Sequence, residues 1–176
     1  MPADLTSPLP NQPRKRGFPP VTNAGTRLLI LGSLPGEQSL VRQEYYGNPQ
    51  NAFWRLMSGV TGIDLVPLAY NARLEALLGC GVGLWDVVAE AHRPGSLDSA
   101  IRARDDNDLA LLLSTLPQLN TIAFNGGTAA RLGLKVLGAL ADRYRILTLP
   151  SSSPAHTLAY ADKLLKWQDL TVALEG

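Results

Sequence analysis

The sequence has little of what would build a metal centre, a disulfide framework or a membrane span. Its 176 residues include one cysteine and two histidines, and their scattered positions give no metal-ligand spacing, so we predict neither zinc nor an iron–sulfur cluster. A single cysteine makes no internal disulfide. No apolar run reaches the length of about 18 residues that a spanning helix needs, and the proline-rich start lacks the apolar core of a secretory signal. These absences predict a soluble, cytoplasmic protein.

The chain also has no large excess of positive or negative charge. Sixteen Lys and Arg residues against 15 Asp and Glu leave a net charge of +1, so no overall field draws the chain to a polyanion. A local excess, Arg14-Lys15-Arg16, stands among prolines with few large apolar residues. Such a composition does not favour packing. We therefore expect residues 1–26 to form a flexible arm, either a solvated tail or a phosphate-binding tether, and residues 27–176 to form a single domain.

Four short apolar runs of strand type end abruptly in small or polar residues. They cover residues 28–31, 82–85, 122–124 and 146–149, and helix-like segments come between them. This alternation indicates an α/β fold with a parallel sheet covered on both faces. Ligands bind such sheets beyond the carboxyl ends of the strands. We therefore expect the four loops that follow the strands to face one site.

Helical spacing of apolar residues marks two of the connecting segments. The stripe after the third strand consists of Ala129, Leu132, Val136 and Leu140, and that of the last helix of Leu158, Ala161, Leu165 and Val172. We expect both stripes to face the core. Ser153 and Pro154 are typical of a helix start, so we expect the last helix to begin at Ala155.

The loop after the first strand reads Gly32-Ser33-Leu34-Pro35-Gly36. Its two glycines let the backbone approach a ligand closely, and the proline stiffens it. The composition suits a flat ring or a phosphate held against main-chain groups, although a structural turn would look the same. It is neither a Walker loop nor a dinucleotide fingerprint, so we expect no nucleotide cofactor.

Three motifs in order resemble one known family. They are residues 32–36 with Ser39-Leu40, the segment Tyr45-Tyr46-Gly47-Asn48-Pro49-x-Asn51-x-Phe53-Trp54, and residues 150–156. Across residues 27–170 the chain resembles the hypoxanthine-DNA glycosylases of the uracil-DNA glycosylase superfamily. The resemblance implies a three-layer α/β/α sandwich around a four-stranded parallel sheet. It also implies a monomeric enzyme that hydrolyses the N-glycosidic bond of a flipped-out deaminated base in DNA, hypoxanthine favoured, without cofactor or metal.

Only some of the catalytic residues that the resemblance implies are present in this chain. Many uracil-removing relatives have an Asn or Asp in the first motif that acts on the attacking water, but Ser33 and Leu34 stand there in this chain. In the family resembled here the catalytic Asn lies in the second motif and maps onto Asn51, which could equally cap the following helix. Asn48 stands where family members usually have His. We expect Asn51 and Ser33 to be the catalytic residues.

We expect residues from several loops to bind the base. Tyr46 matches the aromatic that stacks on the extruded base in relatives, with ordinary packing as its alternative. Asp86 ends the second strand where relatives read the base, or it caps or pairs with an arginine. Asn125 could reach a base edge, or serve a turn before Gly126-Gly127. The first loop completes the expected base site with Gly32, Leu34, Pro35 and Gly36.

The third motif offers a phosphate site. Ser151, Ser152 and Ser153 bring hydroxyls and amides together before the last helix, a combination that suits an anion, and relatives pinch the DNA backbone with this loop. His156 could contact phosphate or the leaving purine, or face solvent. No lysine lies in the three motifs, which favours a monofunctional enzyme without strand cleavage.

Three other functions fit the same residues. The chain could belong to another, uracil-removing branch of the superfamily, or bind damaged bases without cutting them. It could also be a small-molecule enzyme whose flavodoxin-like sheet binds a free nucleotide.

Overall fold

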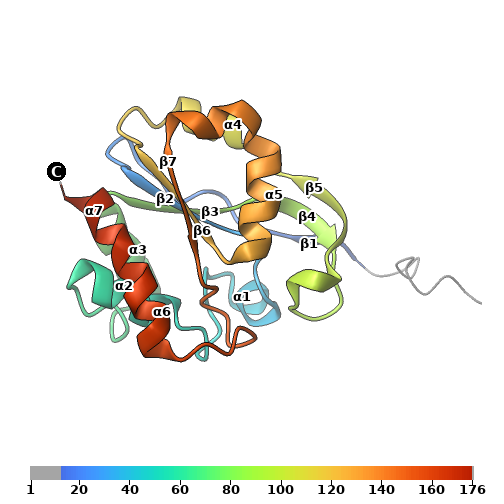
Figure 1. The fold of residues 1–176 in the computed structure, drawn as a ribbon. Coiled ribbons are helices and arrows are strands. Elements are labelled where there is room, and N and C mark those ends of the chain that lie inside the picture. The colour runs from blue at the N-terminus through green and yellow to red at the C-terminus, as the bar shows by residue number, and fades with distance from the viewer. Residues whose placement is uncertain (1–12, 176) are drawn as a thin grey trace, which may run out of the picture.

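A four-stranded parallel sheet forms the centre of the computed structural model, which describes residues 13–175 (Figure 1). Its strands are β2 (Leu28–Gly32), β3 (Val82–Asp86), β6 (Thr121–Asn125) and β7 (Arg145–Leu149). They lie in the order β3-β2-β6-β7, and every neighbouring pair is parallel. The four runs read as strands are thus confirmed. All five residues of β2 are buried, as expected for a strand with helices on both faces.

Helices cover both faces of this sheet. On one face, α2 (Phe53–Thr61), α3 (Tyr70–Gly79), α6 (Tyr160–Trp167) and α7 (Thr171–Leu174) pack against the side chains of Leu28 and Ile30. On the other, α4 (Leu109–Ser114) and α5 (Gly127–Leu137) pack against Leu29 and Leu31. Short helical turns complete the chain, namely α1 (Glu37–Arg42), η1 (Asp98–Ala100), η2 (Gly138–Arg143) and η3 (Gln168–Leu170). The three-layer α/β/α sandwich is therefore confirmed.

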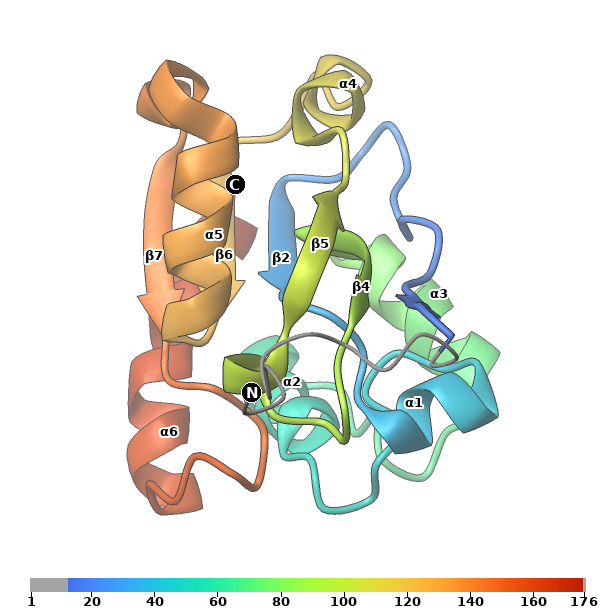
Figure 2. The same cartoon turned by 90° about the vertical axis from the view of Figure 1, so that its right-hand side faces the viewer.

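A second, smaller sheet was not expected from the sequence. It consists of β1 (Lys15–Arg16), β4 (Val88–His92) and β5 (Arg102–Asp106), all paired antiparallel in the order β1-β4-β5. The chain enters β4 directly after β3, so the small sheet continues from the carboxyl end of the main one (Figure 2). The loop between β4 and β5 is thereby brought to the same end of the molecule as the four loops.

The flexible arm predicted up to residue 26 is wrong for residues 13–26, which pack on the domain. Lys15 and Arg16 pair with β4, and Val21 forms a bridge to Leu84. Proline-rich chain can take such an edge position because it needs few ladder donors. The positive charges are matched, since Arg14 Nε lies 2.9 Å from a carboxylate oxygen of Glu90 and Lys15 pairs with Glu37. Residues 1–12 of the expected arm lie outside the described residues.

The last helix also differs from its prediction. It begins at Tyr160, and residues 153–159 form turns, so Ala155 does not start a helix. Leu165 and Val172 are 71% and 55% exposed, whereas Lys163 and Trp167 are buried. The stripe expected after the third strand does face the core, with Ala129 and Leu132 buried. Among the described residues, no helix is long and apolar enough to cross a membrane.

Candidate active site

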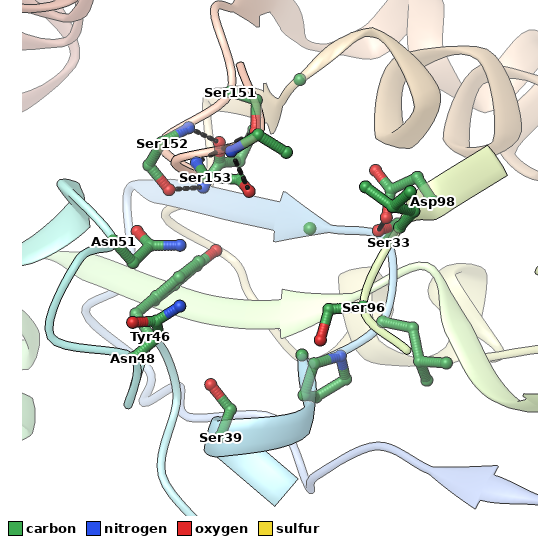
Figure 3. Close-up of a pocket in the computed structure, with 18 of the residues that line it drawn as sticks. Ser33, Ser39, Tyr46, Asn48, Asn51, Ser96, Asp98, Ser151, Ser152 and Ser153 are labelled. Atoms are coloured by element: carbon green, nitrogen blue, oxygen red, sulfur yellow. Dashed lines mark hydrogen bonds between the residues drawn. The ribbon is translucent and has the colours of Figure 1, made fainter. Parts of the chain in front are cut away.

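The carboxyl ends of the four central strands open onto one pocket of about 560 Å³. Segments far apart in the sequence meet there, as Figure 3 shows for the second motif, the serine loop (residues 151–153) and the η1 segment. Every site residue that the sequence singled out lines this pocket, namely Gly32, Ser33, Leu34, Pro35, Gly36, Tyr46, Asn51, Asp86, Asn125, Ser151, Ser152, Ser153 and His156. Ser96 and Asp98, from the loop between β4 and β5, line it as well.

The floor of the pocket lies where β2 and β3 end side by side. Gly32 pairs in register with Asp86. A Cβ placed on Gly32 would lie 2.6 Å from Asp86 Oδ1 and 3.4 Å from the Tyr46 hydroxyl oxygen. Any side chain at this position would therefore collide with the carboxyl group. Glycine at this position lets the Asp86 carboxyl group lie directly against the end of β2, with the Tyr46 hydroxyl nearby.

Asp86 is a buried carboxyl group with an unmatched oxygen. Asp86 is 5% exposed, and its Oδ2 has no hydrogen-bond partner among residues 13–175. Burial, followed by the nearby charge of Asp98, raises the pKa of Asp86 to about 7, against an opposing effect of Arg93. Desolvation penalises the ionised form of such a group. The backbone carbonyl of Asp86 accepts a hydrogen bond from Asn107 at 2.7 Å.

Arg93 supports the first loop from behind, and sequence reasoning missed it. Its guanidinium is buried and donates to the carbonyl oxygens of Leu34 at 3.2 Å and Pro35 at 2.6 Å, and to that of Gly95 at 2.8 Å. The described hydrogen bonds of Arg93 go to main-chain carbonyls. Arg93 therefore does not pair with Asp86 through a hydrogen bond, although pairing with an arginine was one alternative for this residue. The loop is held in place through its backbone.

Ser33 is joined to a carboxylate that the sequence did not reveal. Its hydroxyl donates to Asp98 Oδ1 at 2.6 Å, and the two side chains meet at one edge of the pocket (Figure 3). Ser33 is 7% exposed. No local motif could have signalled Asp98, because it lies 65 residues from its partner. A hydroxyl bonded to a carboxylate is a better proton acceptor than a hydroxyl alone.

Tyr46 and Asn51 stand on the opposite side of the pocket. The Tyr46 ring stacks on Phe53 with centroids 3.8 Å apart and an interplanar angle of 18°, which covers one of its faces. Burial raises the pKa of its hydroxyl. Asn51 Oδ1 accepts a hydrogen bond from the Phe53 amide at 2.9 Å; the N-cap residue of α2 is Ala52, so Asn51 supports the start of the helix from one residue before the cap. Its side chain points into the pocket beside Tyr46 (Figure 3).

Asn125 is bound to the serine loop. Its Nδ2 donates to Ser152 Oγ, and its Oδ1 accepts from the Ser152 amide, both at 2.9 Å. The prediction that Asn125 reads a base edge therefore depends on its second amide hydrogen. Asn48, where relatives usually have His, accepts a hydrogen bond from the Gln50 amide at 2.9 Å.

The serine loop is ordered by contacts within the chain. Ser151 Oγ accepts from the Ser153 amide at 3.1 Å, and Ser153 Oγ accepts from the Ala155 amide at 3.2 Å. The buried Lys163 donates to the Ser153 carbonyl at 3.1 Å. Both serine hydroxyls act as acceptors here, so their hydrogens remain for an incoming anion. His156 is exposed at the pocket rim.

A pocket at the carboxyl ends of a parallel sheet, lined by all three motifs, is what the resemblance to the glycosylases implies, and the comparisons with known proteins agree. Residues 19–173 match the family model of the Uracil DNA glycosylase superfamily. The chain therefore belongs to the uracil DNA glycosylase superfamily, and the resemblance drawn from the three motifs is confirmed.

Among individual proteins, the chain is similar to two proteins named hypoxanthine DNA glycosylase. One, from Methanosarcina acetivorans, is 40% identical over 154 residues, which cover 88% of this chain and 96% of the relative. The other, from Methanosarcina barkeri, is 38% identical over 156 residues, or 89% and 97% of the two chains. A solution NMR structure of a candidate uracil DNA glycosylase from Methanosarcina acetivorans superimposes with a TM-score of 0.82 at 39% identity, over 93% of this chain and 99% of that one.

Proposed function

We propose that the protein is a monofunctional DNA repair glycosylase that hydrolyses the N-glycosidic bond of a flipped-out deaminated base, hypoxanthine favoured, and leaves an abasic site. The observation that carries this proposal is the meeting of all three motifs in one pocket of a superfamily member. Its partner is DNA, which places the enzyme in the compartment that holds the DNA. It acts as a monomer, and the mechanism uses only groups of the chain, without metal or cofactor.

The extruded base stacks on Tyr46. A base that leaves the duplex loses its stacking partners, and an aromatic face replaces them. Phe53 holds the Tyr46 ring from one side, which leaves the other side for the base. Gly32 lets the Asp86 carboxyl group lie against the end of β2, so the base edge meets this carboxyl group beside Tyr46.

Breaking the glycosidic bond develops positive charge on the sugar and negative charge on the base. The Asn51 amide, beside Tyr46, donates to the leaving base or orients the attacking water. Ser33 accepts a proton from that water, because Asp98 can take the proton of the Ser33 hydroxyl in turn. A serine hydroxyl alone is a poor base, and the contact with Asp98 makes up for this.

The serine loop holds the DNA backbone next to the flipped nucleotide. Ser151 and Ser153 are partly exposed in the wall of the pocket, which His156 also lines, and phosphate oxygens arrive there as the base enters. Contacts of this kind position the DNA without reading its sequence.

The function is tested by incubating the protein with duplexes that carry hypoxanthine, uracil or xanthine, followed by alkali. We expect alkali-sensitive nicks, formed faster with hypoxanthine than with uracil, because neither Ser33 nor Leu34 supplies the first-motif group of uracil-removing relatives. Uracil release at an equal or higher rate would place the chain in another branch. Tight binding without nicks would indicate a reader of damage. If the protein neither cuts nor binds these duplexes, the result would point to a free nucleotide as substrate.

The phosphate role of the serine loop gives a second expected result. Replacing Ser152 and Ser153 together by alanine should slow excision by about 30-fold at saturating enzyme, because the flipped state in which the reaction occurs loses two hydrogen bonds worth about 1 kcal/mol each. Single-turnover rates measure this loss. Ser114→Ala, on α4 at the other end of the sheet, is the matched control. Normal excision by the double variant would mean that the loop is purely structural.

A further inference from the structure

The Asp86 carboxyl group lines the pocket that receives the base in the proposed function. The carboxyl group lines the pocket at the end of β3, where it lies directly against Gly32 and near the Tyr46 hydroxyl. Within residues 13–175, its Oδ2 atom is shielded from solvent and has no hydrogen-bond partner. An ionised oxygen that is buried and unpaired is costly, so this environment favours a protonated carboxyl group in the wall of the pocket.

We propose that Asp86 is neutral in the free enzyme and transfers its proton to a ring nitrogen of the leaving purine. This inference rests on the proposed glycosylase function and makes Asp86 the general acid of that reaction.

The surroundings of Asp86 favour the neutral form. Asp98, on η1, places a second carboxylate close by, and Tyr45 and Tyr46 of the second motif lie near enough for their phenol groups to interact electrostatically with Asp86. Arg93, a cation that acts on it, directs its described hydrogen bonds to main-chain carbonyls. Burial and Asp98 together raise the pKa of Asp86 to about 7, near the value at which a general acid works best at neutral pH.

Asp86 gives its proton to N7 or N3 of hypoxanthine, the bond between N9 and the sugar carbon breaks with its electron pair going to the base, and the base leaves neutral. Water adds to the sugar carbon, and the proton it loses restores Asp86 through Ser33 and solvent. Uracil has no ring nitrogen with a free lone pair, so it cannot accept this proton in the same way. The acid therefore favours purines.

Asp86→Asn tests the transfer because it keeps the shape of the side chain and removes the titrating proton. With wild-type enzyme, single-turnover excision of hypoxanthine should fall as the pH rises through about 7. The variant should be at least about tenfold slower at pH 6, lose this pH dependence, and approach the wild-type rate near pH 9. Asp98→Asn keeps an acceptor for Ser33 and removes a like charge, so the midpoint should move to lower pH. An unchanged pH profile in Asp86→Asn would overturn the proposal.

The acceptor atom is identified with duplexes that carry 7-deaza or 3-deaza analogues of deoxyinosine. On the analogue that lacks the accepting nitrogen, Asp86→Asn should cause no further loss of rate. A full loss on both analogues would contradict proton transfer to the ring.

Thermal unfolding tests the neutral form without any activity. A carboxyl group whose pKa is raised in the folded protein destabilises the fold as the pH rises from about 4 to about 7, and the penalty persists above that range. Asp86→Asn should therefore melt at a higher temperature than wild type at pH 8, and the difference should vanish near pH 4. An equal difference at both pH values would show Asp86 to be ionised and overturn the inference. A wild-type protein that passes this test but excises no hypoxanthine would refute the proposed function instead.

Discussion

Asn51→Ala is expected to lower the single-turnover rate of hypoxanthine excision by at least about tenfold, which corresponds to 1.4 kcal/mol of barrier. The Asn51 side chain lies in the pocket beside Tyr46, and its Oδ1 is held by the Phe53 amide. This bond fixes the orientation of the side chain, so its NH2 group is directed at the base or the water. Excision of hypoxanthine from a duplex under saturating enzyme measures the loss.

The same hydrogen bond makes a control necessary, because Asn51 also supports the start of α2. Loss of such a capping contact costs about 1 kcal/mol of stability. Asn51→Asp keeps the acceptor for the Phe53 amide and removes the NH2 donor, so it should unfold near the wild-type temperature and still excise slowly. If both variants excise at the wild-type rate, Asn51 is a cap and the mechanism is wrong.

Tyr46→Ala is expected to slow excision by about 10-fold to 100-fold, because base–aromatic stacking contributes about 1–3 kcal/mol per base. The stack on Phe53 shows that the ring is already held in position before a base arrives. Tyr46→Phe keeps this stack and should retain most of the rate. Single-turnover excision across the three proteins separates the ring from its hydroxyl.

Binding to undamaged DNA is the control for Tyr46. An unextruded base does not reach the ring, so Tyr46→Ala should bind undamaged duplex as tightly as wild type does. If Tyr46→Ala excises hypoxanthine as fast as Tyr46→Phe, the ring is only part of the packing around Phe53.

The central sheet could be predicted because its chemistry is local. A parallel strand buried on both faces is apolar along its whole length, and β2 shows this in five consecutive residues. The edge of the small sheet carries no such signal. The sequence of β5 is Arg-Ala-Arg-Asp-Asp, and four of these five residues are exposed. Its strand character comes from pairing with β4 alone.

The orientation of the last helix could not be predicted from periodicity. Spacing shows which residues share a face, but it does not decide which face is buried. Here the buried face includes Lys163, whose Nζ binds the Ser153 carbonyl, and Trp167, whose Nε1 donates to the Pro150 carbonyl at 2.9 Å. The two contacts turn Leu165 to the solvent. Polar bonds to the serine loop thus determine the rotation of α6.

Some residues of the candidate site could likewise be predicted from the sequence, and others could not. Residues 32–36, 45–54 and 150–156 could be named from the sequence because each motif is contiguous. Asp98 and Arg93 could not, because they reach the first loop from 65 and 59 residues away. They come from the β4–β5 region, whose exposed, charged residues resemble an ordinary surface hairpin. Only the fold shows that this hairpin forms one wall of the pocket.

The loops around the pocket are anchored mostly through their main chain, and this has a consequence for how specificity can evolve. Arg93 binds carbonyls of the first loop, while Lys163 and Trp167 bind carbonyls of the segment that contains the serine loop. A carbonyl is present whatever the side chain. Loop residues can therefore be exchanged, and the set of bases accepted can change, while the backbone framework that receives the nucleotide stays as it is.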